Sequence, residues 1–496
     1  MEKRDNIFAS ALQKESRWTH TENGALALNS TGEAVLDFFS VVGALRNADE
    51  IRIYRLFEEA YKESPLLATR TLYYGRDIRG GGLGERETFR KLLVYAAERH
   101  PECVEPNIHL IGLYGRFDDL YSLVGTPLED KMWDYMRSLF VSDLELMELG
   151  HPCSLLSKWI KTPDASSPRT RALGIKTAMK LGYSVYDFKR KLRALRKYLD
   201  IVEIKMSARK WAEIDYSAVP SNAMMKHRKA FWKHDEEGMR KFLESLEKGE
   251  TKINASTLYP YDLIEKILDF WHEKVEEDPV VEAQWKALPN YVEPGTNALV
   301  IADTSGSMSG RPMASALGLA IYFAERNTGA YHNLFMSFSN WSTIHELKGE
   351  TLAQKLESID MRDWSSSTNL EAAFMKVLEI AVNNHIPKSE MVKSLIVITD
   401  MEINPYIVGE WTFYDAMKAK YESNGYDIPN VVYWNVNSRH DVYHADSDRK
   451  GVQLVSGQST STFKQLVGSV GMTPVEMMLK VLNGGRYDLV TVEGVV

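Results

Sequence analysis

Hydrophobic residues in the first ~285 positions recur mainly at helical spacing. In the segment 33–46, Leu36, Phe39, Val42 and Leu45 fall on one face of a helix. The same period returns in eight further segments, at 51–61, 66–74, 85–99, 128–149, 170–181, 186–206, 225–233 and 258–275. Few stretches alternate with period two, and the connecting loops are short. The pattern therefore predicts antiparallel helix pairs stacked as a solenoid.

The pattern changes after about Trp285. Asn297–Ala302 and Ser394–Thr399 are short apolar runs rich in β-branched residues, which is typical of parallel strands buried on both faces. Further strands are expected at Asn333–Phe338, Asn430–Asn437 and Gln453–Ser456, with helices between them. This alternation predicts a doubly wound α/β domain. We predict an all-helical domain at 1–286 and an α/β domain at 287–496.

Composition narrows the class of protein without naming a function. Apolar residues make up 44% of the 496 residues and charged residues 26%, an ordinary balance for a folded chain. Two cysteines are too few for a disulfide framework or a four-cysteine zinc site. The sequence has neither an apolar run of the ~20 residues that span a membrane nor a signal-peptide core after its first residues. We expect a cytoplasmic protein without membrane segments.

The formal net charge of −8 hides an uneven distribution. Between Lys158 and Lys241 the chain carries 21 lysines and arginines against nine aspartates and glutamates, so this stretch has a net charge of +12. The remainder of the chain is correspondingly acidic. A global sum can conceal a basic face, and the total does not exclude nucleic acid as a partner.

One cluster of oxygen-bearing residues suggests a metal site. The first predicted strand of the α/β domain leads into Asp303-Thr304-Ser305-Gly306-Ser307. Thr368 precedes a predicted helix, and Asp400 closes the strand Ser394–Thr399. Ligands of open α/β sheets bind at the carboxyl ends of the strands, where these segments converge. Hydroxyl and carboxylate oxygens suit Mg²⁺ or another divalent cation, whereas the alternative is a metal-free helix N-cap.

These residues resemble the metal-ion-dependent adhesion site of von Willebrand factor A domains, with the likeness covering roughly residues 295–496. The resemblance implies that Ser305, Ser307 and Thr368 bind Mg²⁺ directly and that Asp303 and Asp400 act directly or through water. It also implies that a partner's carboxylate often completes the coordination. Met401-Glu402 follows Asp400 here in place of the family's frequent glycine, which leaves the conformation of that loop open.

A glycine-rich segment of the helical part resembles a second family. It lacks the Gly-Lys-Ser/Thr of a phosphate loop and follows no strand, so it is neither a nucleotide loop nor a dinucleotide fingerprint. Asn23-Gly24-Ala25 followed by Arg76-Asp77-Ile78-Arg79-Gly80-Gly81-Gly82-Leu83-Gly84-Glu85-Arg86 resembles the TROVE module of the Ro ribonucleoproteins. The best match is to a related family of unknown function from bacteria, viruses and plants. The resemblance implies a HEAT-like helical ring, closed by the α/β domain, that binds RNA.

Four arginines near the glycine turn admit two roles. Arg76, Arg79, Arg86 and Arg90 can meet phosphate, or they can pair internally with carboxylates such as Asp77 and Glu85. We favour the internal role.

Segment 186–206 offers the best local support for RNA binding. Its apolar residues from Phe188 to Met206 form one stripe at helical spacing, and its cations lie off that stripe. Cations in such a row neutralise phosphates, and nearby aromatic residues such as Trp232 offer stacking surfaces. The alternative is a solvated helix face. The predicted RNA-binding residues are Lys189, Arg190, Arg193, Arg196, Lys197, Lys226, Arg228 and Lys229.

Together these patterns predict a Ro-like protein that binds single-stranded or small structured RNA, possesses a Mg²⁺ site and is monomeric. The alternative is a scaffold that binds protein partners through the metal without RNA. We expect no enzymatic activity, because Ser305 lacks a neighbouring histidine base and the hydroxyl-rich site lacks an evident general base.

Overall fold

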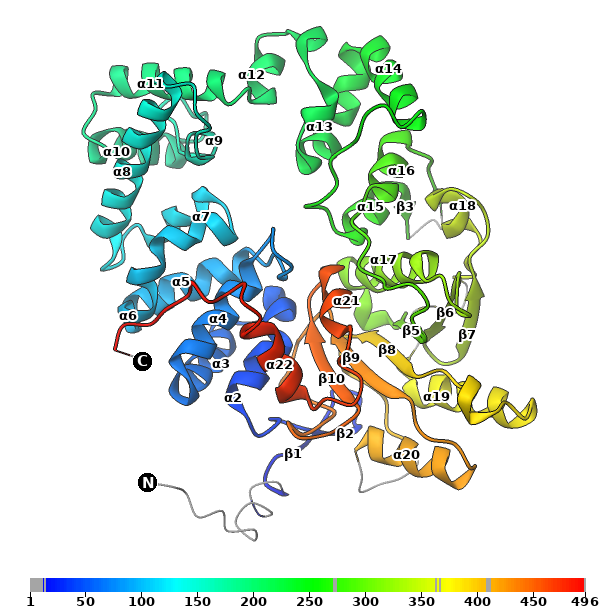
Figure 1. The fold of residues 1–496 in the computed structure, drawn as a ribbon. Coiled ribbons are helices and arrows are strands. Elements are labelled where there is room, and N and C mark those ends of the chain that lie inside the picture. The colour runs from blue at the N-terminus through cyan, green and yellow to red at the C-terminus, as the bar shows by residue number, and fades with distance from the viewer. Residues whose placement is uncertain are drawn as a thin grey trace.

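The computed structural model describes residues 12, 15–270, 274–361, 364, 367–406 and 412–494. A six-stranded sheet forms the centre of its C-terminal part, in the order β10-β9-β8-β5-β6-β7 (Figure 1). Neighbouring strands are parallel except β6 and β7, which are antiparallel. The strands are β5 (Ala298–Asp303), β6 (Leu334–Phe338), β7 (Ser342–Glu346), β8 (Ser394–Thr399), β9 (Asn430–Asn435) and β10 (Val452–Ser456).

Helices cover both faces of this sheet. Val300 and Ile398 enter the core beneath α17 and the first helices of the chain, whereas Ile301 and Val397 enter the core beneath α19 and α20. Burial on both faces explains why these strands are continuous apolar runs. The helices of this part are α17 (Arg311–Arg326), α18 (Leu352–Glu357), α19 (Leu370–Asn383), α20 (Phe413–Ser423), α21 (Ser461–Leu466) and α22 (Pro474–Leu482). The predicted α/β architecture is confirmed.

The N-terminal part is helical, as predicted, apart from short two-stranded pairings. Its first half contains the hairpin β1 (Trp18–His20) and β2 (Leu26–Leu28), then α2 (Ala34–Val41), α3 (Glu50–Glu63), α4 (Pro65–Arg76), α5 (Glu87–Arg99), α6 (Pro101–Val104), α7 (Ile111–Tyr114) and α8 (Glu129–Glu148). Its second half contains α9 (Leu156–Trp159), α10 (Pro168–Lys180), α11 (Val185–Tyr198), α12 (Val202–Ser207), α13 (Ser221–His234), α14 (Glu236–Glu247), α15 (Pro260–Ile267), β3 (Leu268–Asp269), β4 (Lys274–Val275) and α16 (Pro279–Lys286). Serine caps begin several helices; Ser184, for example, accepts a hydrogen bond from the backbone N–H of Asp187 at the start of α11.

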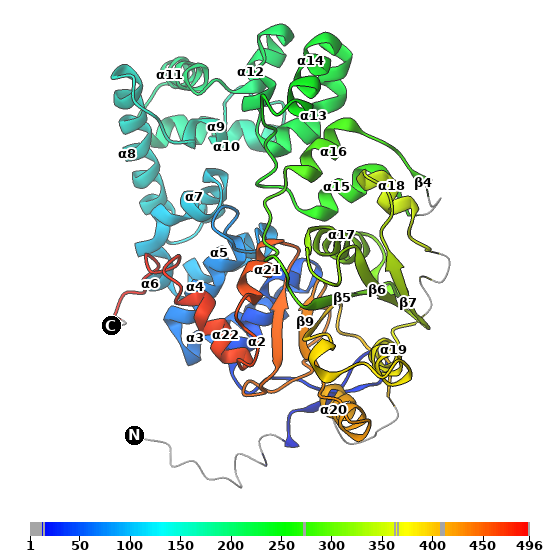
Figure 2. The same ribbon diagram turned by 45° about the vertical axis from the view of Figure 1, so that its right-hand side comes forward.

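The two ends of the helical part both pack on the α/β part. Helix α2 contacts β10 and α22, whereas α15 contacts α17 and α16 contacts α18. Between these ends the helices trace an arc from α5 through α8, α11 and α12 to α13 and back through α16 (Figures 1 and 2). The described elements therefore form a closed ring.

A final segment, 483–494, lies along the first helices, and we call it the C-terminal strap. Arg486 donates from Nε to Asp77 Oδ2 at 2.9 Å. The backbone N–H of Thr491 donates to Asn107 Oδ1 at 3.1 Å. The C-terminal strap is thus bound to the segments that contain Asp77 and Asn107.

The hydrophobic cores do not follow the predicted division at residue 287. One core runs from α2 to α11 and on to one face of the sheet, while α12, α13, α14 and α16 enclose a separate core around Phe231 and Met239. The two-domain division itself stays a prediction. Two predicted helices differ. The segment 186–206 is broken between α11 and α12, where Asp200 adopts a φ of +48° that a continuing helix does not allow. The helix predicted at 258–275 ends at Ile267, and the short strands β3 and β4 follow it.

Candidate metal centre and nucleic-acid surface

Two buried aspartates meet where the order of the strands reverses. Asp303 ends β5, Asp400 follows β8, and these two strands are neighbours in the sheet. Asp303 accepts hydrogen bonds from Thr399 Oγ1 at 2.6 Å and from the backbone N–H of Ser305 at 2.9 Å. The neighbouring parallel strands place both carboxylates at the ligand-binding edge of a doubly wound sheet.

The electrostatics of this pair favour a cation. Burial, together with repulsion from Asp400, raises the pKa of Asp303 to about 7, against the hydrogen bonds from Thr399 and Ser305. Arg439 Nη2 lies 3.0 Å from Asp400 Oδ2 and neutralises one negative charge. Among the described residues no cation pairs with the other carboxylate, that of Asp303, so a metal ion at this edge would relieve the repulsion.

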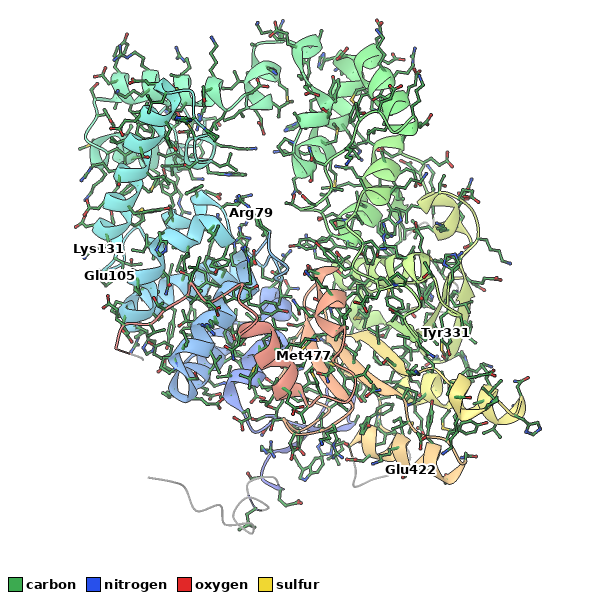
Figure 3. All side chains as sticks on the ribbon, in the orientation of Figure 1. Arg79, Glu105, Lys131, Tyr331, Glu422 and Met477 are labelled. Carbon is green, nitrogen blue, oxygen red and sulfur yellow. The ribbon has the colours of Figure 1, made fainter. Side chains whose placement is uncertain are left out.

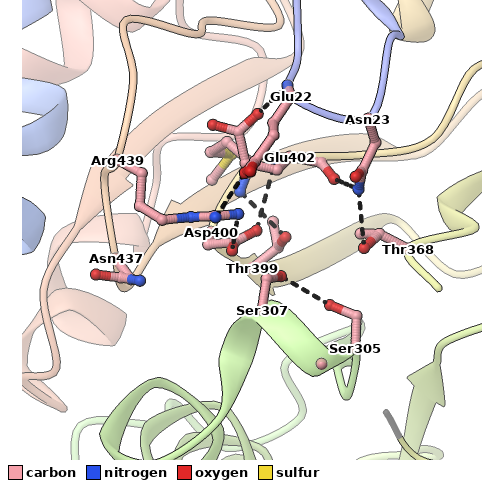
Figure 4. Close-up of polar contacts among 12 residues, drawn as sticks. Glu22, Asn23, Ser305, Ser307, Thr368, Thr399, Asp400, Glu402, Asn437 and Arg439 are labelled. Carbon is pink, nitrogen blue, oxygen red and sulfur yellow. Dashed lines mark hydrogen bonds and ion pairs between the residues drawn. The ribbon is translucent and has the colours of Figure 1, made fainter. Parts of the chain in front are cut away.

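The predicted hydroxyl donors lie at the same edge of the sheet. Ser305 Oγ and Ser307 Oγ are 3.2 Å apart (Figure 4). Thr368 is buried, and its carbonyl oxygen accepts a hydrogen bond from the backbone N–H of Asn404, in the loop after Asp400. Three uncharged hydroxyls with two carboxylates form a donor set that fits Mg²⁺.

An N-terminal turn that the sequence did not point to covers this edge. Asn23 Nδ2 donates to Thr368 Oγ1 at 3.4 Å and to the carbonyl oxygen of Glu402 at 2.5 Å. The backbone N–H of Glu22 donates to Glu402 Oε2 at 2.6 Å, and Thr21 Oγ1 donates to the carbonyl oxygen of Ile403 at 2.7 Å. The sequence pattern Asn23-Gly24-Ala25 indicated a resemblance to a family, but it did not predict that this turn contacts the metal edge.

The loop after Asp400 adopts the backbone conformation that a glycine would favour. Met401 has a φ of +72°, in the left-handed region, although it carries a side chain. Its side chain is buried in the core beneath α19 and α20, and His444 Nε2 lies 2.9 Å from its carbonyl oxygen. The sequence alone left the conformation of this loop open, because Met401 stands where the family often has glycine. The structure shows that tertiary packing holds Met401 in the strained left-handed conformation.

A second set of ionisable groups joins the N-terminal turn to the loop after Asp400. The ligand atoms of Glu22, Glu402 and His440 lie within 4.8 Å of one another. His440 Nδ1 is 2.8 Å from Glu402 Oε1, and Glu402 is also bonded to the turn. These groups are therefore engaged with each other and with the backbone of the N-terminal turn.

The predicted RNA-binding cations fall into two groups. Arg196 and Arg228 are engaged inside the fold: Arg196 donates to the carbonyl oxygens of Ser157 and Ile160, and Arg228 pairs with Asp278 at 2.6 Å. We expected these two side chains to meet phosphate. In the structure their guanidinium groups bind other segments of the helical part instead.

The other six cations lie at or near the surface. Lys189 pairs with Asp164 at 2.7 Å, and Arg190 lies 3.5 Å from Asp187. Four cations are exposed and have no ion-pair partner among the described residues: Arg193, Lys197, Lys226 and Lys229. These four are the residues best placed to meet phosphate.

The glycine-rich segment is mainly structural. Arg76 and Arg90 both donate to the buried carboxylate of Asp119, at 2.8 and 2.7 Å. The internal role is confirmed for these two arginines, but the expected partners were wrong, because Asp77 pairs with Arg486 of the C-terminal strap and Glu85 pairs with Arg46. Arg79 is exposed and lies at the inner edge of the ring (Figure 3).

Comparisons with known proteins agree with a family of unknown function. The domain of unknown function DUF2828 matches residues 21–140 and 154–294, just over half of the chain. The domain of unknown function DUF7788 matches residues 297–482. An uncharacterized protein of Acanthamoeba polyphaga mimivirus is 29% identical over 507 aligned positions, which cover 93% of this chain and 87% of the viral protein. Within the described part of the chain, no helix is both long and apolar enough to cross a membrane.

Proposed function

This chain belongs to the DUF2828 family, and on that premise we propose that it is a Ro-like RNA-binding protein with a Mg²⁺ site. Two features support the proposal. The helical part and the α/β part together close a ring, which is the arrangement that the TROVE and von Willebrand factor A resemblances imply. The helical part also presents cations to solvent. In this proposal the helical part is a HEAT-like repeat and the sheet part is a von Willebrand factor A domain.

The observation that carries the proposal is the exposed face of α11. Tyr186, Arg190, Arg193 and Lys197 lie at positions i, i+4, i+7 and i+11 of the helix, and all four are exposed. This spacing places them on one face, where an aromatic ring and three cations can meet bases and phosphates of a single strand. Lys226 and Lys229 on α13 are also exposed.

The decisive experiment measures binding of a fluorescent single-stranded RNA to the full chain over a salt series. We expect the affinity to fall steeply as salt rises, because phosphate contacts release counterions. Arg193→Glu with Lys197→Glu is expected to weaken binding at least about tenfold at low salt and to reduce the salt slope by roughly two. A matched control, Lys348→Glu with Lys376→Glu, reverses two exposed lysines of the α/β part and should leave binding nearly unchanged.

Two results would count against RNA binding. Negligible binding of the wild-type chain at low salt would end the proposal. Equal losses in the two double variants would show a response to net charge and not to the α11 face.

The residues that would hold the proposed cation are Asp303, Ser305, Ser307, Thr368 and Asp400. When bound, it supplies a positive centre that attracts an anionic oxygen from a partner, since most of its protein donors are uncharged. We propose a binding protein without catalytic activity, because the described hydrogen-bond partner of Ser305 Oγ is Ser307 Oγ and not a histidine base.

A protein-interaction scaffold is the second candidate, favoured by one exposed side chain. Trp341 lies at the tip of the β6–β7 hairpin and is 72% exposed. Asn369, next to Thr368, donates from its backbone N–H to Ser339 of the same hairpin at 2.9 Å, so the tryptophan borders the metal edge. Exposed tryptophans are frequent anchors of protein interfaces. Partners that are retained without EDTA, and lost both with EDTA and on Asp303→Ala, would support this candidate.

A further inference from the structure

Arg439 connects a buried and an exposed carboxylate at the metal edge. Its Nη2 lies 3.0 Å from Asp400 Oδ2, and its Nη1 lies 2.5 Å from Glu22 Oε2 (Figure 4). Asp400 is completely buried, whereas half of the Glu22 side chain is exposed. The guanidinium is therefore a cation tethered to one of the carboxylates that would serve the metal.

The position of this guanidinium has an electrostatic consequence. A divalent cation between Asp303 and Asp400 would approach a positive charge that is already bonded to Asp400. Two positive charges that are bonded to the same carboxylate repel each other strongly in a partly buried site. Glu22 acts in the opposite sense, because its carboxylate attracts the guanidinium toward the outer rim of the site.

The hydrogen bonding of Arg439 indicates that its present position is not fully satisfied. Its Nε is buried and has no hydrogen-bond partner among the described residues. A buried donor without a partner costs free energy, which lowers the cost of moving the guanidinium away from Asp400. The side chain is about one-third exposed, so it borders solvent.

We propose that Arg439 is a built-in competitor of the metal at Asp400, and that Glu22 weakens this competition by holding Arg439. The inference rests on the proposed metal site and adds its regulation. Without a divalent cation, Arg439 balances the buried carboxylate; with the cation bound, the guanidinium shifts to Glu22 and leaves Asp400 to the metal site.

The test is calorimetric titration of the EDTA-stripped full chain with Mn²⁺ alone. Arg439→Gln should bind Mn²⁺ roughly tenfold more tightly than the wild type, because the competing charge is gone. Glu22→Gln should bind several-fold more weakly. In the Arg439→Gln background, Glu22→Gln should have little further effect, since it acts through the arginine. Arg449→Gln is the matched control, because Arg449 has similar exposure and pairs with Asp415.

Each outcome decides between distinct conclusions. An affinity that is unchanged or weaker in Arg439→Gln would overturn the inference, and so would an equal effect of Glu22→Gln in both backgrounds. Absence of Mn²⁺ uptake by both the wild type and Arg439→Gln would refute the metal site itself. Uptake by Arg439→Gln alone would support the competition strongly.

Folding of the variants is monitored by thermal unfolding in EDTA. Glu22 is exposed, so Glu22→Gln keeps the test open if Arg439→Gln does not fold. Its control is Glu59→Gln, which removes an equally exposed carboxylate that pairs with Arg55. A Glu22→Gln variant that binds Mn²⁺ as tightly as this control would overturn the proposal.

Discussion

Replacing Asp303 by asparagine is expected to stabilise the metal-free protein, although it removes a residue of the proposed site. Asp303 is completely buried, and burial together with Asp400 raises its pKa from 3.8 to about 7. A raised carboxyl pKa means that the folded state favours the protonated form. The contribution of this group to stability is therefore present below about pH 4 and is lost as the pH rises through about 7.

The size of the effect follows from the two pKa values. One pKa unit corresponds to about 1.4 kcal/mol, so the ionised group costs on the order of 4 kcal/mol above pH 7. Asparagine keeps the shape but offers only one acceptor oxygen for the bonds from Thr399 and Ser305, which forfeits roughly 1–2 kcal/mol. The net gain in the free energy of unfolding is about 2 kcal/mol.

The assay is urea unfolding at pH 5 and pH 8, in EDTA and in Mg²⁺. The advantage of Asp303→Asn in EDTA should be larger at pH 8 than at pH 5. In Mg²⁺ at about one hundred times its dissociation constant, the wild type should gain about 2.7 kcal/mol, whereas the variant should gain little. A variant that is less stable than the wild type in EDTA at pH 8 would refute the argument from burial.

Three further outcomes are expected from the same structure. Asp77→Ala should cost about 1–3 kcal/mol of unfolding free energy, because it leaves the backbone N–H groups of Arg79 and Gly80 without their acceptor and the partly exposed Arg486 without its partner. Limited proteolysis should then release the C-terminal strap, and an intact strap would contradict this. Burial lowers the pKa of His345 from 6.5 to about 4, so the folded state favours the neutral imidazole. As the pH falls from 6.5 to 4, the wild type should lose up to about 3 kcal/mol of unfolding free energy relative to His345→Phe. Parallel pH profiles of the two proteins in urea unfolding would exclude this cause. Gly43→Ala should reduce the free energy of unfolding by about 1–3 kcal/mol and lower the melting temperature, because a Cβ there would lie 2.7 Å from the Cα of Gly457. An unchanged melting temperature would show that the structure relaxes freely around the added methyl group.

The sheet was predictable wherever both faces of a strand are buried. Asn297–Ala302 and Ser394–Thr399 are continuous apolar runs, and they correspond to β5 and β8. Strand β7 was missed because it lies at the sheet edge, where Ile344 is exposed and polar residues interrupt the run. The hairpin β1–β2 was missed because strands of three residues give no periodic signal.

The candidate site was predictable only in part, for a physical reason. Asp303 and Asp400 follow recognisable strands, so the topology alone brings them together. Asn23, Glu22 and Arg439 reach the site through tertiary contacts across hundreds of residues, and no local pattern reports such contacts. The separation of buried arginines from exposed ones on α11 and α13 likewise depends on which helices pack against each face.

The closed ring also sets the order in which the chain can complete its fold during synthesis. Helix α2 has seven buried residues out of eight, yet its partners include β10 and α22, which the ribosome produces more than 400 residues later. The backbone N–H of Gly43, for example, bonds Ser456 Oγ across 413 positions. The first helices therefore stay partly uncovered until β10 and α22 have been synthesised, and closure of the ring is a late step of folding.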